Sequence, residues 1–450
     1  MKPAKLFGLI LCLLSVATGS NAQSVLDQYL AEGLQNNQQL FQESLAVENS
    51  KLALSEAKGL YLPSVNLLAD YTMSDGGRTI SFPVGDLLNP VYGTLNTLTG
   101  TDNFASIENV NEQFFPNNFH DARVRVIQPL FNSDIYYNQK AQQQLLKVSE
   151  AKRTVYEEEL KKEIKIAYFN YWQAVKALGI YQSNLGLLEA LVDFNEKRFR
   201  EDQITMDEVY RAQFELAQLQ AEQSGALAQE ATAKAYFNFL LNRAYDAEIL
   251  EDQTLNIDPL LIGDISMDME TVISRRHELS QIQSAQEAQI QAIRLAQGSK
   301  LPQVNAVFDV GNQGFDGDFG SDQNYWLLNL GFSWNIFRGF QNNRRIEQAK
   351  VSLDMIESQE EQLRKQIALE VTRSNTQFIA ARQQYRAQQV AQRSAQKSFD
   401  IMSSKYRESQ ALLVQYLDAR SAALSAELQL NVAKYKLMSA RAQLDRALAY

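Results

Sequence analysis

Two long stretches of the chain contain no proline, and this constrains the fold more than any other feature. All eight prolines of the 450 residues lie outside 130–258 and 303–450, and no glycine occurs within 340–450. These stretches are rich in Ala, Gln, Glu, Lys and Leu, which are strong helix formers. Apolar residues recur along them at helical spacing, as Leu353, Ile356, Leu363 and Ile367 do. We therefore expect coiled-coil helices over about 134–200 and 341–407, each roughly 100 Å long at 1.5 Å per residue.

Four short segments break this helical pattern and alternate between apolar and polar residues with a period of two. They cover about 64–73, 122–131, 303–311 and 325–337. In the last one, Leu328, Leu330 and Phe332 alternate with Asn329 and Gly331. This alternation predicts strands with one apolar face, which suits a membrane sheet as well as a half-buried soluble sheet.

The chain also repeats itself. The segment Leu62–Val65, which reads Leu-Pro-Ser-Val, returns 239 residues later as Leu301–Val304, which reads Leu-Pro-Gln-Val. Further along, Phe199–Glu201 matches Tyr406–Glu408 at an offset of 207. Each half therefore reads as short helix, strand, loop, strand, very long helix, turn and helix, which indicates a duplicated architecture.

The two halves differ mainly in the loop between their paired strands. The repeats are expected at 23–245 and 264–450, with a linker at 246–263. The first repeat carries a much longer loop near 74–121, rich in Asn, Asp, Gly and Thr, whose prolines at 83, 90 and 116 argue against a continued strand. We expect this loop to face the cell exterior or, if the strands form a barrel, to fold over the barrel mouth.

Charge and composition exclude several classes of function. Residues 1–22 have the basic start, apolar run and Ser20-Asn21-Ala22 end of a secretory signal peptide. The net charge of −10 argues against a nucleic-acid partner. The only cysteine, Cys12, lies inside the signal, and only two histidines occur, so no cofactor or metal is expected. No catalytic motif is present, so an enzyme is not expected.

If the four strands lie in a membrane, one chain cannot close a barrel with them. An open sheet edge cannot face lipid, because its N–H and C=O groups would have no partner. A closed barrel needs at least about eight strands, so at least two chains would have to share it.

Taken together, these features resemble the TolC family of outer-membrane channels over about 24–450. The Leu-Pro-x-Val entry to each first strand is typical of the family, and so is the segment Tyr406–Arg420 around the second turn. The resemblance implies a mainly α fold with membrane β-strands. It also implies a homotrimer, with a 12-stranded β-barrel continuous with an α-helical periplasmic tunnel, and it makes 246–263 an equatorial linker.

The resemblance also implies a function and a location. The chain would be the passive outer-membrane duct of a tripartite efflux pump or a type I secretion system. Its partners would be a periplasmic adaptor, an inner-membrane transporter and outer-membrane lipid. The alternative is a structural periplasmic coiled-coil spacer or adaptor protein. The two-faced strands favour the duct, and neither a lipoyl-like β module nor an inner-membrane anchor is visible in the sequence.

Two groups of residues become candidate sites through the resemblance. The adaptor-docking tip would comprise Arg200, Glu201, Asp202, Gln203, Arg407, Glu408, Ser409 and Gln410. The periplasmic aperture would comprise Glu208, Tyr406, Gln415 and Asp418. In a trimer, Asp418 would recur three times around one axis and form an acidic ring.

The tip departs from the family pattern in two ways. Asp202 and Ser409 occupy the places of the family's tip glycines, so turns of a different shape are expected. Gln415 replaces the first of two aspartates that the family often carries, and Ala411 replaces a basic residue. In addition, Thr205-Met206-Asp207-Glu208 fits a capping box and predicts a helix start at this point.

Overall fold

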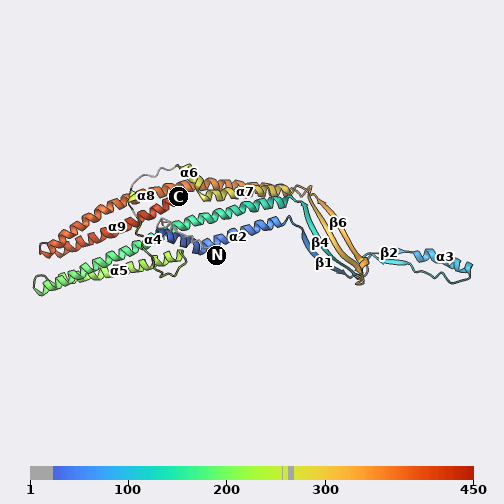
Figure 1. Ribbon diagram of the computed structural model, residues 1–450, viewed down its shortest axis with the longest axis horizontal. Coiled ribbons are helices and arrows are strands. Elements are labelled where there is room, and N and C mark those ends of the chain that lie inside the picture. Colours follow the sequence, from blue (N-terminus) through green and yellow to red (C-terminus); the bar gives the residue numbers. More distant parts are fainter. Residues whose placement is uncertain (1–23, 256, 262–267, 450) are drawn as a thin grey trace, which may run out of the picture. The chain divides into compact units, whose positions relative to one another are not determined.

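The computed structural model describes residues 24–255, 257–261 and 268–449 (Figure 1). They form two compact units. The helical unit comprises the chain up to Glu48, Lys147–Gln283 and the chain from Ser358 onward, and the strand unit comprises Asn49–Leu146 and Ser284–Glu357. Each unit draws on both halves of the sequence. The predicted signal peptide and part of the predicted linker lie outside the described residues.

The strand unit contains an antiparallel four-stranded sheet in the order β1-β4-β5-β6. Its strands are β1 (Ser64–Thr72), β4 (Phe119–Phe131), β5 (Gln303–Phe315) and β6 (Asn324–Ser333). The sequence predicted all four, although β4 and β5 extend further than expected. Within this chain, β1 and β6 are the free edges of the sheet, because each pairs with one strand only.

The pairing register gives this sheet two different faces. Val65 pairs with Val126, and Val126 pairs with Phe308, which in turn pairs with Leu328, so one face is apolar across all four strands. Leu328 is 55% exposed and Leu330 is 68% exposed, so this apolar face is bare in the single chain. The opposite face is polar and carries an ion-paired ladder.

That ladder fixes the polar face. Arg125 on β4 makes two hydrogen bonds of 2.8 Å to the carboxylate of Asp309 on β5. Asp121 on β4 accepts from the hydroxyl of Tyr325 on β6 at 2.9 Å and also pairs with Arg123. An exposed apolar face opposite a hydrogen-bonded polar face is the arrangement that suits a lipid-facing sheet.

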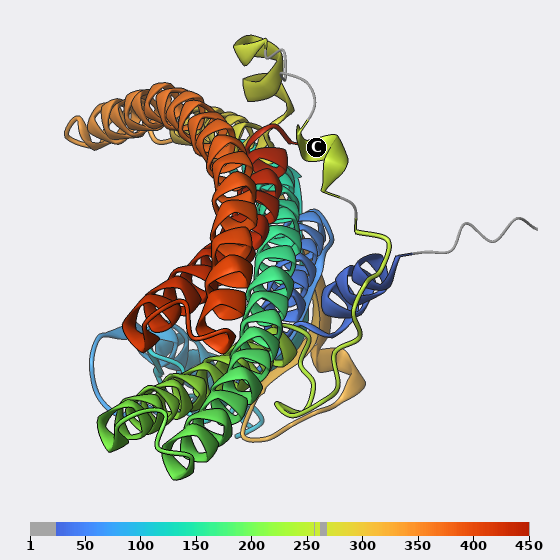
Figure 2. The same ribbon diagram turned by 90° about the vertical axis from the view of Figure 1, so that its left-hand side faces the viewer.

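The long helices form two hairpins. They are α4 (Ser133–Arg200) with α5 (Met206–Leu240), and α8 (Gln341–Arg407) with α9 (Leu413–Ala447). All but the first part of α4 and of α8 belongs to the helical unit. The bounds of α4 and α8 agree with the predicted ones to within one residue. Figure 2 shows the two hairpin turns end on.

Equivalent residues of the two repeats hold the ends of the returning helices. The short helices are α1 (Val25–Asn36), α2 (Gln38–Gly59), α6 (Met269–Arg275) and α7 (His277–Gly298). Asn37, between α1 and α2, donates to the carbonyl of Leu240 at the end of α5 at 2.9 Å. Arg276, 239 residues later, donates to the carbonyl of Ala447 at the end of α9 at 3.1 Å. Each residue thus satisfies a carbonyl that a helix end leaves unpaired.

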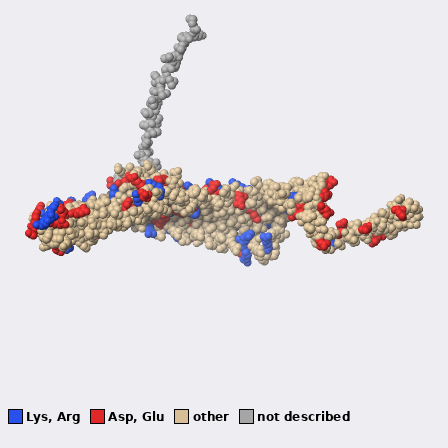
Figure 3. Space-filling view, turned by 90° about the horizontal axis from the view of Figure 1, so that it is seen from below, with Lys and Arg blue, Asp and Glu red and all other residues tan. Residues whose placement is uncertain are grey.

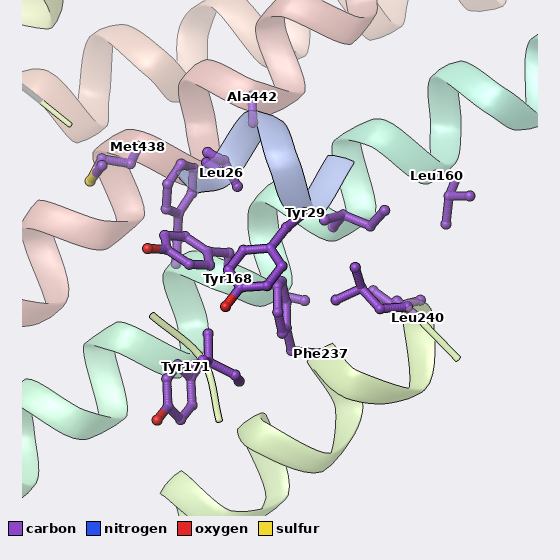
Figure 4. Close-up of a cluster of buried hydrophobic side chains, with 14 of the residues drawn as sticks. Leu26, Tyr29, Leu160, Tyr168, Tyr171, Phe237, Leu240, Met438 and Ala442 are labelled. Carbon is purple, nitrogen blue, oxygen red and sulfur yellow. The ribbon is translucent and has the colours of Figure 1, made fainter. Parts of the chain in front are cut away.

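Three apolar clusters form the core of the helical unit. The first packs α1 against α4, α5 and α9 around Tyr29, Tyr168 and Phe237, of which Phe237 is fully buried (Figure 4). The second packs α6 and α7 against α8 and α9 around Val371 and Leu437. The third joins both hairpins near their turns. None of the described helices is long and apolar enough to span a membrane.

The segment that was expected to be a loop at 74–121 is a folded excursion instead. It contains β2 (Thr79–Phe82), α3 (Val84–Thr99) and β3 (Val110–Gln113), and β2 pairs with β3 as a separate ribbon. The helix includes Pro90, one of the three prolines that argued against a continued strand. Residues 119–121 belong to β4 rather than to the excursion.

Candidate aperture and docking tip

The two hairpin turns have the same backbone geometry, 207 residues apart. Asp202 and Ser409 have φ angles of 57° and 60°, in the left-handed region. The amide of Gln203 donates to the carbonyl of Arg198, and the amide of Gln410 donates to that of Lys405, which closes each helix with a Schellman-type bond. A different turn shape was expected because glycine is absent. Both turns nevertheless adopt the conformation that glycine favours.

Side chains from the two turns contact each other directly. Arg198, in the last turn of α4, donates to the hydroxyl of Ser409 at 3.0 Å. Its guanidinium also lies 5.6 Å from the ring centroid of Phe194 and 5.7 Å from that of Tyr406. A cation over two aromatic faces stabilises the contact. Arg198 therefore ties the first hairpin to the second at the tip.

A buried polar cluster lies just behind this contact. The hydroxyl of Tyr406 lies 2.8 Å from Oδ1 of Asn195 and 3.2 Å from Oε2 of Glu208. Asn195 is fully buried and Tyr406 is 2% exposed. Burial, followed by the negative charge of Glu208, raises the pKa of Tyr406 to about 12, so the hydroxyl stays protonated and able to donate. The cluster links α4, α5 and α8.

The predicted capping box at the start of α5 is wrong. Thr205 is the N-cap residue, as expected, but its side chain makes no capping hydrogen bond. Glu208 is turned toward Tyr406 of the other hairpin instead. At the equivalent place on α9, Gln415 does bond back, because its Oε1 accepts from the amide of Leu412 at 3.1 Å. Gln415 therefore holds the start of a helix.

Asp418 is exposed, and it differs from the other three aperture candidates because it makes no hydrogen bond or ion pair within the described part of the chain. Arg211 occupies the equivalent position on α5, 207 residues earlier, and is likewise exposed. Equivalent positions of the two repeats thus carry opposite charges. The structure brings Glu208 and Tyr406 together but leaves Asp418 free of both.

Sequence reasoning missed one buried cation at this end of the molecule. Arg420 on α9 is 4% exposed and pairs with Glu215 on α5 at 3.3 Å. Burial lowers the pKa of Arg420, and the charge of Glu215 opposes this effect. The signal was present in the sequence, because Arg420 lies on the apolar stripe of α9 between Leu417 and Leu424.

All eight residues of the predicted docking tip are exposed. They surround the two turns, where Lys, Arg, Asp and Glu side chains gather on the surface (Figure 3). Arg200 pairs with Glu196 along its own helix, and Arg407 donates to Ser403 in the same way. Within the described residues, no group of His, Cys, Asp and Glu could hold a metal ion.

Comparisons with known proteins agree with this architecture. Residues 269–449 match the family described as outer membrane efflux protein. The outer membrane protein TolC of Salmonella enteritidis is 22% identical over 447 residues, covering 94% of this chain and 82% of that protein. TolC of Escherichia coli K12 is also 22% identical, over 413 residues, covering 88% of this chain and 76% of that protein.

Solved structures match over most of both chains. The Campylobacter jejuni CmeC outer membrane channel has a TM-score of 0.77 at 15% identity, covering 94% of this chain and 85% of that one. The open state of the Neisseria gonorrhoeae MtrE outer membrane channel has a TM-score of 0.75 at 18% identity, covering 95% and 89%. At such identities the structural matches establish the fold alone.

The fold is thus that of an outer membrane channel built from a sheet and long helical hairpins. Residues 269–449 belong to the family of outer membrane efflux proteins, and most of the chain is similar to TolC. This is a family of channels rather than of enzymes. Its members work in efflux complexes with adaptors and inner-membrane transporters.

Proposed function

We propose that the chain is the outer membrane duct of a tripartite efflux pump or a type I secretion system, with a helical tunnel in the periplasm. It passes substrates that an inner-membrane transporter and a periplasmic adaptor deliver, without changing them chemically. The observation that carries this proposal is the four-stranded sheet, whose bare apolar face lies opposite a face of paired charges. A purely periplasmic spacer or adaptor has no use for such a face.

The duct is a homotrimer. Each edge strand, β1 or β6, is paired on one side only within the described chain. An unpaired edge in lipid leaves backbone N–H and C=O groups without hydrogen bonds, at several kcal/mol each. Three chains of four strands each close a twelve-stranded barrel in which β1 of one copy pairs with β6 of the next, and this arrangement leaves no free edge.

The chain is organised as two repeats, 23–245 and 264–450, joined by the linker at 246–263. Two sets of equivalent hydrogen bonds support this division. One set closes the turns at Gln203 and Gln410, and the other holds the helix ends through Asn37 and Arg276.

The exposed tip docks on the adaptor. The eight tip residues stand on rigid hairpin turns, and binding residues concentrate on exposed loops that a rigid scaffold positions. Charge reversal of Glu201 and Glu408 together should weaken adaptor pull-down. Charge reversal of Glu150, which is exposed on α4 away from the turns, should not. Equal adaptor pull-down by the two variants would show that the tip does not contact the adaptor.

The aperture carries Asp418 as its acid. Asp418 is exposed, whereas Glu208 is held by Tyr406. Three copies of Asp418 around one axis attract cations, while three copies of Arg211 oppose this attraction. Because Gln415 stands where the family often has a second aspartate, the ring carries less charge than the usual pattern.

Single-channel recording in planar bilayers tests this aperture. The variants are Asp418→Asn and Glu208→Gln, alone and combined, with Arg211→Gln as the opposite change. We expect Asp418→Asn to reduce cation selectivity and block by divalent ions, and Arg211→Gln to increase both. Unchanged cation selectivity and unchanged divalent-ion block in the double variant would show that neither carboxylate lines the constriction.

Efflux itself is tested in the cell. Deleting the gene should raise the accumulation of a fluorescent efflux substrate, and the intact chain should restore export. A variant with charge reversal at both Glu201 and Glu408 should reach the outer membrane but fail to restore export. Normal export by the deletion strain for every substrate and secreted protein examined would count against a duct.

A further inference from the structure

The excursion 74–117 of the strand unit is a specifically folded element. Asn96 of α3 makes a reciprocal pair of hydrogen bonds with the backbone of Phe104, donating to its carbonyl at 2.8 Å and accepting from its amide at 3.0 Å. Asn89 does the same with Ile107, at 2.9 Å in both directions. The two asparagines lie seven residues apart, on one face of the helix, and hold the returning chain along it.

The start of α3 is closed by a third reciprocal pair. The amide of Asp86 donates to Oδ1 of Asn109 at 3.1 Å, and Nδ2 of Asn109 donates to the carboxylate of Asp86 at 3.0 Å. Beside it, a Cβ on Gly85 would lie 2.5 Å from the carbonyl oxygen of Ile107, so only glycine allows this approach. These contacts fix the helix and the returning chain in one arrangement.

This well-defined element has almost no core of its own. Gly85 is its only buried residue. On α3, Leu87 is 70% exposed, Val91 50% and Leu98 78%. At 100° per residue these three lie within an arc of about 40° around the helix, and Asn89 and Asn96 lie on the opposite side. A two-stranded ribbon with one helix is only marginally stable in water when its apolar side chains stay exposed.

The charges of the excursion indicate what covers this apolar stripe. It carries five acidic residues, Asp75, Asp86, Asp102, Glu108 and Glu112, and one basic residue, Arg78. Surfaces that bind anionic lipid head groups carry clusters of Lys and Arg instead. Residues 87–101 contain no charge at all, so two copies of the stripe can meet without repulsion.

The position of the excursion also favours a second copy of this chain as the partner of the stripe. It begins at Ser74, two residues after the end of β1, which is a free edge of the sheet. Hydrogen bonds hold the two ends of the excursion together at this point. The amide of Ser74 donates to Oδ1 of Asn117 at 3.1 Å, and the hydroxyl of Ser74 donates to the carbonyl of Pro116 at 3.0 Å. In the proposed trimer a neighbouring copy occupies the β1 edge.

We infer that the stripe Leu87, Val91 and Leu98 is a contact between copies of this chain, in which the excursion of one protomer packs against that of its neighbour. This inference rests on the proposed trimer. The excursion is thus an apolar self-association element attached to the sheet. It joins the protomers at a place separate from the strand edges and the helical tunnel.

Cross-linking at single cysteines tests this contact in the full-length protein with Cys12→Ser. Leu98→Cys lies in the stripe, and Thr97→Cys is the matched control, exposed and a quarter turn away. A short bismaleimide is applied to cells, and the detergent-solubilised mass is measured in parallel. Thiols that face each other within one assembly react at an effective concentration near millimolar, so we expect about tenfold more linked protomers for Leu98→Cys than for the control.

Each other result overturns the inference. Equal cross-linking of the two variants would mean that the cross-links come from chance collisions and not from a defined contact. A trimeric mass without linking at Leu98 means that lipid or a foreign protein covers the stripe, and the proposed trimer then survives. A detergent-solubilised mass of one or two chains would refute both the proposed trimer and the proposed contact.

Discussion

Replacing Tyr406 by phenylalanine removes one hydroxyl from the centre of the tip and leaves the ring in place. The ring keeps its neighbours, including Tyr416 at 5.3 Å between centroids and the guanidinium of Arg198. What disappears is the hydroxyl that lies 2.8 Å from Asn195 and 3.2 Å from Glu208. Tyr406→Phe therefore tests the polar link between the hairpins separately from their packing.

The size of the effect follows from burial. Asn195 is fully buried, so its Oδ1 loses its hydrogen-bond donor in a place that bulk water does not reach. Leaving such an acceptor unsatisfied costs about 1–3 kcal/mol. The balance between joined and separated hairpins should therefore shift by about 5- to 150-fold toward separation.

Hydrogen exchange of the tip peptides and single-channel conductance measure this shift. We expect faster exchange around the start of α5 and more frequent high-conductance openings. Tyr416→Phe is the matched control, because Tyr416 is 7% exposed and its hydroxyl makes no hydrogen bond within the described chain. If the two variants behave alike, the hydroxyl of Tyr406 does not hold the hairpins together and the reasoning is refuted.

Three further predictions concern stability. Asp202→Gly should raise the unfolding free energy of the tip by up to about 1 kcal/mol, because Asp202 is in the left-handed region, and an unchanged thermal transition would argue against this. Ser409→Gly should gain less, because it also removes the hydroxyl that accepts from Arg198. Burial would raise the pKa of Glu278, but its arginine partners outweigh burial and lower it to about 2, so this group should contribute stability above pH 4.5 that is lost as the pH falls toward 2. Glu278→Gln should flatten that part of the pH–stability curve. Gly85→Ala should separate α3 from the carbonyl of Ile107 and raise protease cleavage of the excursion, while an unchanged cleavage rate would mean that the approach is not required.

Much of the fold could be predicted because its signals are local. Helix-forming residues without proline set the bounds of α4 and α8, and period-two alternation located all four strands of the sheet. The excursion was missed for a physical reason. Pro90 and a high content of Thr, Asn and Gly disfavour a helix locally. Helix α3 is held instead by side-chain hydrogen bonds from Asn89 and Asn96 to residues 18 and 8 positions further along the chain.

The candidate site shows the same division. The positions of the turns and the helix start at Thr205 were predicted from local chemistry, but the shape of the turns and the capping box were not predicted correctly. The role of Glu208 was not, because its partner Tyr406 lies 198 residues away in the other repeat. Arg420 was missed as well, although its place on the apolar stripe of α9 was visible in the sequence. Local pattern locates such residues, and tertiary contact decides what they bind.

The mass of the detergent-solubilised protein from the outer membrane fraction tests the central claim most directly. The sheet has two edge strands that are each paired on one side only, and its apolar face is bare, so the account requires copies of the chain to close around one duct. Native mass spectrometry should give a protein mass of three chains. A mass of one or two chains, from protein that retains its helical content, would contradict the account.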